Sequence, residues 1–178
     1  MVLKELALPF NQESDLKDWK NFLKKYKNPK KKVEIALVGK YVSLQDSYKS
    51  IAEAFIHAGA SQDTEVKLRW VYSGDLTEEN LAENFKGIDG MLIAPGFGDR
   101  GIEGKILAAK FARENKIPLL GICLGMQIMT IEFARNVLGL KDANSAEFDL
   151  TTKNPVISLM EEQKNVVDKG GTMRLGAW

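Results

Sequence analysis

The sequence predicts an α/β fold: a doubly wound, mostly parallel sheet with helices on both faces. Short apolar runs alternate along the chain with segments of helical periodicity, which is the pattern of such a sheet. The 178 residues, 44% hydrophobic and 28% charged, have the size and composition of one soluble globular domain. Because the carboxyl ends of parallel strands share one edge, residues that follow these strands are expected to meet there.

The elements are predicted in order along the chain. Residues 15–26 carry apolar side chains at helical spacing, and the polar segment 27–32, broken by Pro29, is typical of a linker. The predicted strands are 33–38, 66–72, 91–94, 119–122 and 155–160. The predicted helices are 47–58, 76–85 with Thr77 as its cap, a segment through Ile106, Leu107 and Phe111, and 126–138 with Gly139 as its stop.

Charge and composition exclude several classes of function. The net charge of +1 gives no general attraction to nucleic acid or to an anionic membrane. One cysteine and one histidine form neither an internal disulfide nor a closed zinc site. The amino terminus lacks the features of a secretory signal, and no apolar stretch approaches the length of a bilayer span. We therefore expect a cytoplasmic protein with no metal site in this chain.

The single cysteine, Cys123, is the strongest chemical signal. It lies between a predicted strand and a predicted helix, with Gly121 and Gly125 two residues away on either side. This is the glycine–x–nucleophile–x–glycine turn, with sulfur in place of a serine oxygen. The positive end of a helix also stabilises a thiolate. The alternative is an inert core cysteine; the pattern favours a nucleophile for acyl transfer.

An acyl-transfer site also needs donors for the developing oxyanion. In this architecture the first donor is the backbone N–H after the nucleophile, here that of Leu124. Gly96 follows the preceding predicted strand and is placed to supply the second. Pro95 has no N–H and cannot donate.

Two other features have weaker functional interpretations. Residues 96–101 match G-x-G-x-x-G, which would make the chain a nucleotide-binding module. That motif expects an acidic residue about 20 positions later, and this chain has Cys123 in that region. His57, the only histidine, lies near the end of an early predicted helix and needs no catalytic explanation. The sequence therefore offers a nucleophile without an obvious general base.

Several segments resemble a known family. Residues 121–127, Gly-Ile-Cys-Leu-Gly-Met-Gln, resemble the nucleophile segment of class I (triad) glutamine amidotransferases. The wider pattern is similar to the CTP synthases, and the resemblance covers essentially the whole chain. The further matching segments are 39–42, 46–50, 98–105, 142–148 and 170–176.

The resemblance implies a function. A CTP synthase is a ligase of pyrimidine biosynthesis whose synthetase domain uses ATP and Mg²⁺ to phosphorylate UTP. Its glutaminase domain releases ammonia from L-glutamine, and the ammonia displaces the phosphate to give CTP. GTP activates the family, whose members form homotetramers. The implied domains are 1–32, the end of the synthetase domain and the linker, and 33–178, a partial glutaminase domain.

The resemblance also implies roles for individual residues. Cys123 would attack the side-chain amide of glutamine, with Gly96 and Leu124 holding the oxyanion. Glu147 would bind the substrate α-amino group, a charge-assisted contact. The glutamine site would be lined by Leu124, Gly125, Met126 and Gln127. Residues resembling the GTP-activation and interdomain region are Lys40, Tyr41 and Tyr48.

The chain departs from the family pattern at three places. Ala94-Pro95 stands where Pro-Gly is usual before Gly96, and Ala146 replaces a threonine beside Glu147. The sequence ends at Trp178, before the family's catalytic histidine and glutamate and a glutamine-binding arginine. We therefore expect a fragment, truncated at the C-terminus, that hydrolyses glutamine poorly. A non-catalytic assembly fragment stays an alternative.

Overall fold

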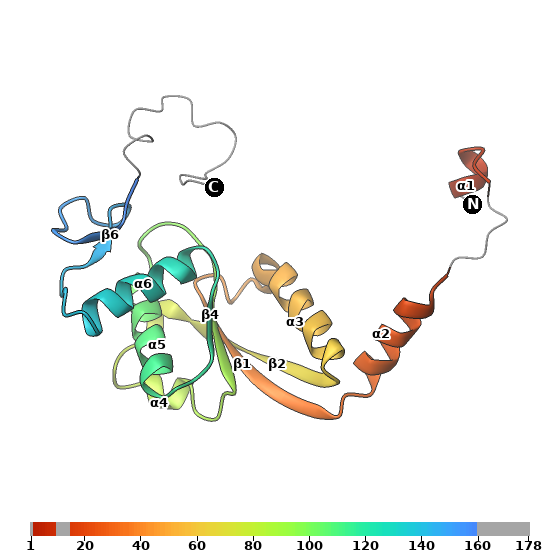
Figure 1. The fold of residues 1–178 in the computed structure, drawn as a ribbon, viewed down its shortest axis with the longest axis horizontal. Helices are drawn as coiled ribbons and strands as arrows, with labels where there is room; N and C mark the ends of the chain where they lie inside the picture. Colours follow the sequence, from red (N-terminus) through yellow and green to blue (C-terminus); the bar gives the residue numbers. More distant parts are fainter. Residues whose placement is uncertain (1, 10–14, 160–178) are drawn as a thin grey trace. The chain divides into compact units, whose positions relative to one another are not determined.

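The computed structural model describes residues 2–9 and 15–159 (Figure 1). The chain divides into two compact units, one of Met1–Val33 with Ser50–Val66 and one of Glu34–Lys49 with Lys67–Trp178. This division reflects packing and groups Ser50–Val66 with the amino-terminal residues. The boundary at residues 32/33 separates the two domains that the family resemblance implies, and it stays a prediction.

Within the described residues, the first unit contains three helices and the beginnings of two strands. The helices are α1 (Val2–Glu5), α2 (Lys17–Lys27) and α3 (Lys49–Ser61). Within this unit the ring of Phe22 on α2 stacks on the ring of His57 on α3, with 4.7 Å between the ring centroids. This contact gives His57 a structural partner; that it has no catalytic role stays a prediction.

The central sheet has the strand order β2-β1-β3-β4. Strand β3 pairs in parallel with both β1 and β4. Ala36 and Val38 point to one face of β1 and Leu37 to the other, and all three side chains are 0% exposed. A strand buried on both faces is typical of a parallel sheet covered on each side. The strands are β1 (Lys31–Gly39), β2 (Thr64–Tyr72), β3 (Gly90–Ile93) and β4 (Leu119–Gly121).

Two helices pack side by side in the second unit and position the end of β3 (Figure 1). They are α5 (Ile102–Glu114) and α6 (Leu124–Asn136). Their apolar side chains enclose Ile93, the last residue of β3. The members of this cluster are Ile93, Ile102, Ile106, Ala109, Leu124, Ile128 and Ile131. The fold class is therefore as predicted, a parallel sheet packed with helices.

The remaining elements of the second unit are short. A second sheet consists of β5 (Asn144–Ser145) and β6 (Pro155–Ile157), which pair in parallel. The others are α4 (Leu81–Asn84) and the 3-10 turns η1 (Gln45–Tyr48) and η2 (Ser73–Asp75).

The predicted helix 76–85 with its Thr77 cap is wrong over most of its length. Only Leu81–Asn84 is helical, and the helix begins after Asn80. The Asn80 side chain accepts a hydrogen bond from the Thr77 N–H at 3.0 Å and donates one to the Asp75 carbonyl at 2.7 Å. These side-chain bonds stabilise a turn in place of the first helical turns.

The other differences are at element ends. Strand β1 begins at Lys31, inside the predicted linker, because the N–H groups of Lys30 and Lys31 bond to the Asp63 carbonyl at 2.7 and 3.2 Å. Helix α6 begins and ends two residues earlier than predicted. Gly139 follows it with φ of 75°, as a helix stop does. Met160 and the segment 170–176 lie outside the described residues.

A buried ion pair between α5 and α6 predicts a stability effect. Arg113 Nη2 lies 2.8 Å from Glu132 Oε1, and the Glu132 side chain is 4% exposed. Arg113→Ala leaves this carboxylate buried without its cation, so we expect a loss of about 3 kcal/mol in the free energy of unfolding. Urea denaturation measures this loss.

Lys110→Ala on the same helix is the control for this prediction. Lys110 pairs with Glu78, whose side chain is 70% exposed, at 3.5 Å, and exposed pairs contribute at most about 1 kcal/mol. Equal losses for the two variants would contradict the prediction.

Candidate active site at the Cys123 turn

Cys123 occupies a strained turn between β4 and α6. Its backbone has φ of 54° and ψ of −109°, a conformation that side chains other than glycine rarely adopt. The residue is the N-cap of α6, and its carbonyl accepts hydrogen bonds from the N–H groups of Met126 at 3.0 Å and Gln127 at 3.3 Å. Its side chain is exposed. The turn thus holds the sulfur at the positive end of a helix and in contact with solvent.

The two glycines of the motif allow the turn because the backbone segments are too close for side chains. A methyl group at Gly121 would lie 2.6 Å from the Gly125 carbonyl oxygen. A methyl group at Gly125 would overlap the Ile93 carbonyl oxygen at the end of β3. Ile122 N–H donates to that same carbonyl at 3.1 Å. Close approach of α6 to β4 requires glycine at position 121, and close approach of α6 to β3 requires it at position 125.

The two residues predicted to supply the oxyanion donors lie near each other. Leu124 is the first residue of α6, and within the described residues its N–H donates to no acceptor. Gly96 follows β3, and a methyl group there would lie 3.7 Å from Leu124 Cδ2. The structure thus brings the Gly96 loop and the start of α6 together, as the sequence predicts. The roles of both amides stay predictions.

Two lysines contact the loop that contains Gly96. Lys105 Nζ donates to the Ala94 carbonyl at 2.9 Å, and Lys40 Nζ donates to the Phe97 carbonyl. Lys105 lies in the first turn of α5 with a side chain that is 0% exposed. The pKa of Lys105 is lowered to about 8: burial is the largest cause, the neighbouring Lys40 charge also lowers it, and the opposite charge of a Cys123 thiolate partly offsets both. Lys105 was not predicted from the sequence, because lysine is ordinarily a surface residue.

The residues predicted to bind glutamine differ in their exposure and in their hydrogen bonds. Gly125 is buried in the first turn of α6, and Met126 is 52% exposed. The Gln127 side-chain oxygen is buried and has no hydrogen-bond partner within the described part of the chain. Glu147 follows β5, is exposed, and its N–H donates to Ser145 Oγ at 3.2 Å. No hydrogen bond among the described residues joins Glu147 to the Cys123 turn.

Three further residues that the resemblance singled out also differ in exposure and contacts; they are Lys40, Tyr41 and Tyr48. Tyr48 is 2% exposed and its hydroxyl accepts a hydrogen bond from the Tyr41 N–H at 3.4 Å, so it supports the backbone after β1. The Tyr41 ring is 42% exposed. Lys40 Nζ and Arg100 Cζ lie 5.2 and 5.9 Å from its centroid. Arg100 was not singled out from the sequence.

The described residues contain no group of three or more histidine, cysteine or acidic side chains that could hold a metal ion. Among their helices, none has the length and apolar character needed to cross a membrane.

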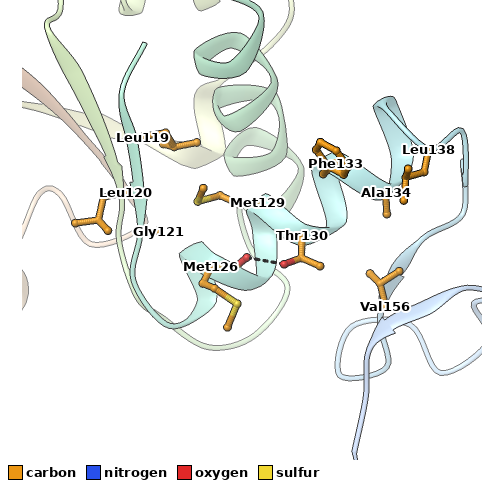
Figure 2. A pocket seen from close by; sticks show the side chains of 10 residues that line it. All are labelled: Leu119, Leu120, Gly121, Met126, Met129, Thr130, Phe133, Ala134, Leu138 and Val156. Atoms are coloured by element: carbon orange, nitrogen blue, oxygen red, sulfur yellow. Dashed lines mark hydrogen bonds between the residues drawn. The ribbon is translucent and has the colours of Figure 1, made fainter. Parts of the chain in front are cut away.

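An apolar groove runs along β4 and α6 beside the Cys123 turn (Figure 2). Its volume is about 550 Å³. Glutamine carries charged and amide groups, so this apolar lining does not suit it. The groove is therefore not the candidate glutamine site, although Met126, one of its lining residues, is also predicted to line that site. Its lining residues are Leu119, Leu120, Gly121, Met126, Met129, Thr130, Phe133, Ala134, Leu138 and Val156.

Comparison with known proteins identifies a family. Residues 43–177 match the family model "Glutamine amidotransferase class-I". The match includes the Cys123 turn, the loop after β3 and α5.

Curated relatives and a solved structure agree with this match. A CTP synthase of Cytophaga hutchinsonii is 63% identical over 99% of this chain, and one of Flavobacterium psychrophilum is 61% identical over all of it. The chain spans about a third of the length of these relatives (33%). The glutaminase domain of Trypanosoma brucei CTPS, solved with bound acivicin, is 40% identical with a TM-score of 0.69. That match covers 75% of this chain and 52% of the solved chain.

The glycine contacts predict the cost of a side chain in the turn. Gly125→Ala places a methyl group against the Ile93 carbonyl oxygen, so we expect a loss of about 3 kcal/mol in the free energy of unfolding. Gly87→Ala is the control, because no atom lies within 4 Å of the new methyl group there, although Gly87, unlike the helical Gly125, has a positive φ of 74°. Gly87→Ala should therefore lose only the free energy that the left-handed conformation costs an alanine, about 1 kcal/mol. Denaturant unfolding measures both losses. If Gly125→Ala loses no more free energy of unfolding than Gly87→Ala, the close packing at Gly125 is refuted.

Burial of Lys105 predicts a pH dependence of stability. The pKa falls from 10.5 in the unfolded chain to about 8 in the folded one. Between these values the unfolded state binds more protons, so stability rises as the pH rises. From pH 7 to pH 10 we expect the wild type to gain about 2 to 3 kcal/mol relative to Lys105→Met. Urea unfolding of both proteins at the two pH values measures this gain, and an unchanged difference would contradict it.

Proposed function

The chain belongs to the class-I glutamine amidotransferases, and we propose that it is the glutaminase part of a CTP synthase, hydrolysing L-glutamine to supply ammonia. One observation carries the proposal: Cys123 is exposed in a strained turn at the amino end of α6, beside the Gly96 loop. The identity of 63% to a curated CTP synthase over 99% of this chain supports the choice within the family.

In the proposed reaction, the Cys123 thiolate forms a bond to the side-chain amide carbon of glutamine. The amide oxygen becomes an oxyanion that the N–H groups of Leu124 and Gly96 stabilise. The carbon–nitrogen bond breaks, the nitrogen takes a proton and leaves as ammonia, and a thioester stays on Cys123. Water then attacks the thioester, which releases glutamate and returns the thiol.

Substrate binding is proposed to involve the start of α6 and the segment after β5. Gly125, Met126 and Gln127 would line the glutamine site, and the unpartnered Gln127 side-chain oxygen is available to accept a hydrogen bond from substrate. Glu147 would bind the α-amino group. Because His57 stacks on Phe22 in the first unit, we assign it no catalytic role and propose that the general base lies elsewhere in a longer polypeptide.

The whole-protein part of the proposal is amination of UTP to CTP. It includes a synthetase domain that uses ATP and Mg²⁺, activation by GTP, and a homotetramer in the cytoplasm. ATP and Mg²⁺ would act in the synthetase domain.

Labelling of Cys123 tests the glutaminase proposal. The diazo-ketone analogue of glutamine should alkylate the purified chain once: sulfur bonds to the diazo carbon, that carbon takes a proton, and dinitrogen leaves. L-Glutamine should slow the reaction by competition, whereas L-leucine, the control, should not. Mass spectrometry should place the label on Cys123, and Cys123→Ser should abolish it.

Labelling that glutamine does not slow would count against a glutamine site. Binding of NAD or ATP in equilibrium dialysis, without such labelling, would favour a nucleotide-binding module at residues 96–101. A stable oligomer in sedimentation velocity, again without labelling, would favour the assembly alternative.

A further inference from the structure

Lys105 is a buried cation that the proposed reaction does not use. Its side chain is 0% exposed, and the charged groups that act on it are Lys40 and Cys123. Within the described residues no carboxylate forms an ion pair with it. A buried ammonium is unfavourable unless it is paired, and methionine would fill similar space without this cost. Packing alone therefore does not explain a lysine at this position.

The Lys105 ammonium is directed at the backbone of the oxyanion loop. It donates to the Ala94 carbonyl at 2.9 Å, and Lys40 donates to the Phe97 carbonyl on the other side of Gly96. A methyl group at Gly96 would lie 3.9 Å from Lys105 Nζ and 3.5 Å from Lys40 Cε. The two lysines thus hold the carbonyl groups on either side of Gly96.

The Gly96 N–H belongs to the peptide group after Pro95, one residue beyond the Ala94 carbonyl. Pro95 has a fixed φ, so the orientation of the Ala94 carbonyl limits the orientations of the following peptide group. Gly96 itself has wide conformational freedom, and without an anchor its amide could turn away. An oxyanion donor stabilises the transition state only when it is already oriented.

We infer that Lys105 is a positioning residue of this site, whose ammonium anchors the Ala94 carbonyl and thereby holds the Gly96 amide toward the oxyanion. The inference rests on the proposed glutaminase function. It assigns Lys105 no contact with substrate, and its effect should fall on the chemical step rather than on glutamine binding.

Two alkylating reagents distinguish a loss of Gly96 positioning from a general disruption of the site. The diazo-ketone analogue of glutamine places a ketone oxygen where the oxyanion donors act, whereas iodoacetamide needs only the thiolate. The readout is the ratio of the two labelling rates at Cys123, measured on the full chain at pH 7. Concentration dependence of the diazo-ketone reaction separates its binding constant from its maximal rate.

We expect Lys105→Met to lower the ratio about tenfold through the maximal rate, with the binding constant unchanged within twofold. Lys105→Gln, whose shorter side chain does not reach as far, should lower it as well. If Lys105→Met does not fold, the ratio is measured on Lys105→Gln. Lys110→Met, at a half-buried position of the same helix where Lys110 pairs with Glu78, should keep the wild-type ratio. Circular dichroism confirms that each variant is folded.

A folded Met or Gln variant with a ratio within twofold of wild type would overturn the inference. An equal fall in both labelling rates would also overturn it, since that would indicate general disruption. These outcomes differ from failure of the proposed function, in which the wild-type chain itself shows no labelling that glutamine slows.

Discussion

The close contact between the amino end of α6 and the last residue of β3 determines the rest of the site. Gly125 lies against the Ile93 carbonyl, and Gly121 lies against Gly125, so no side chain fits at either position. The chain between them must turn sharply, which gives Cys123 its φ of 54°. The strain of such a residue costs about 1 to 3 kcal/mol. The apolar cluster of Ile93, α5 and α6 opposes this cost by holding the helix against the strand.

The same packing brings three strand ends into one chemical unit. Lys40 follows β1, Gly96 follows β3, and Cys123 follows β4, and the parallel pairing places these ends at one edge of the sheet. Lys105 reaches this edge from the first turn of α5. A thiol, a glycine loop and two ammonium groups therefore come from four separate parts of the sequence. Of these groups, only the thiol and the glycine loop lie in local sequence motifs that indicate their chemistry.

Much of the fold could be predicted because the buried strands are continuous apolar runs. The segment 76–85 could not, because its apolar spacing suits a helix while the Asn80 side chain favours a turn. The two-residue strand β5 is too short to show a period. At the site, Cys123, Gly96 and Leu124 were predicted from spacing. Lys105 was not, because burial of a lysine depends on tertiary packing that no local pattern encodes.

The turn is proposed to present the Cys123 sulfur to two backbone amides. A crystal structure of the chain alkylated at Cys123 by the diazo-ketone analogue would test this arrangement. We expect the ketone oxygen about 2.7 to 3.1 Å from the backbone nitrogens of Leu124 and Gly96. A ketone oxygen directed into solvent, or a Cys123 with negative φ and a buried sulfur, would contradict it.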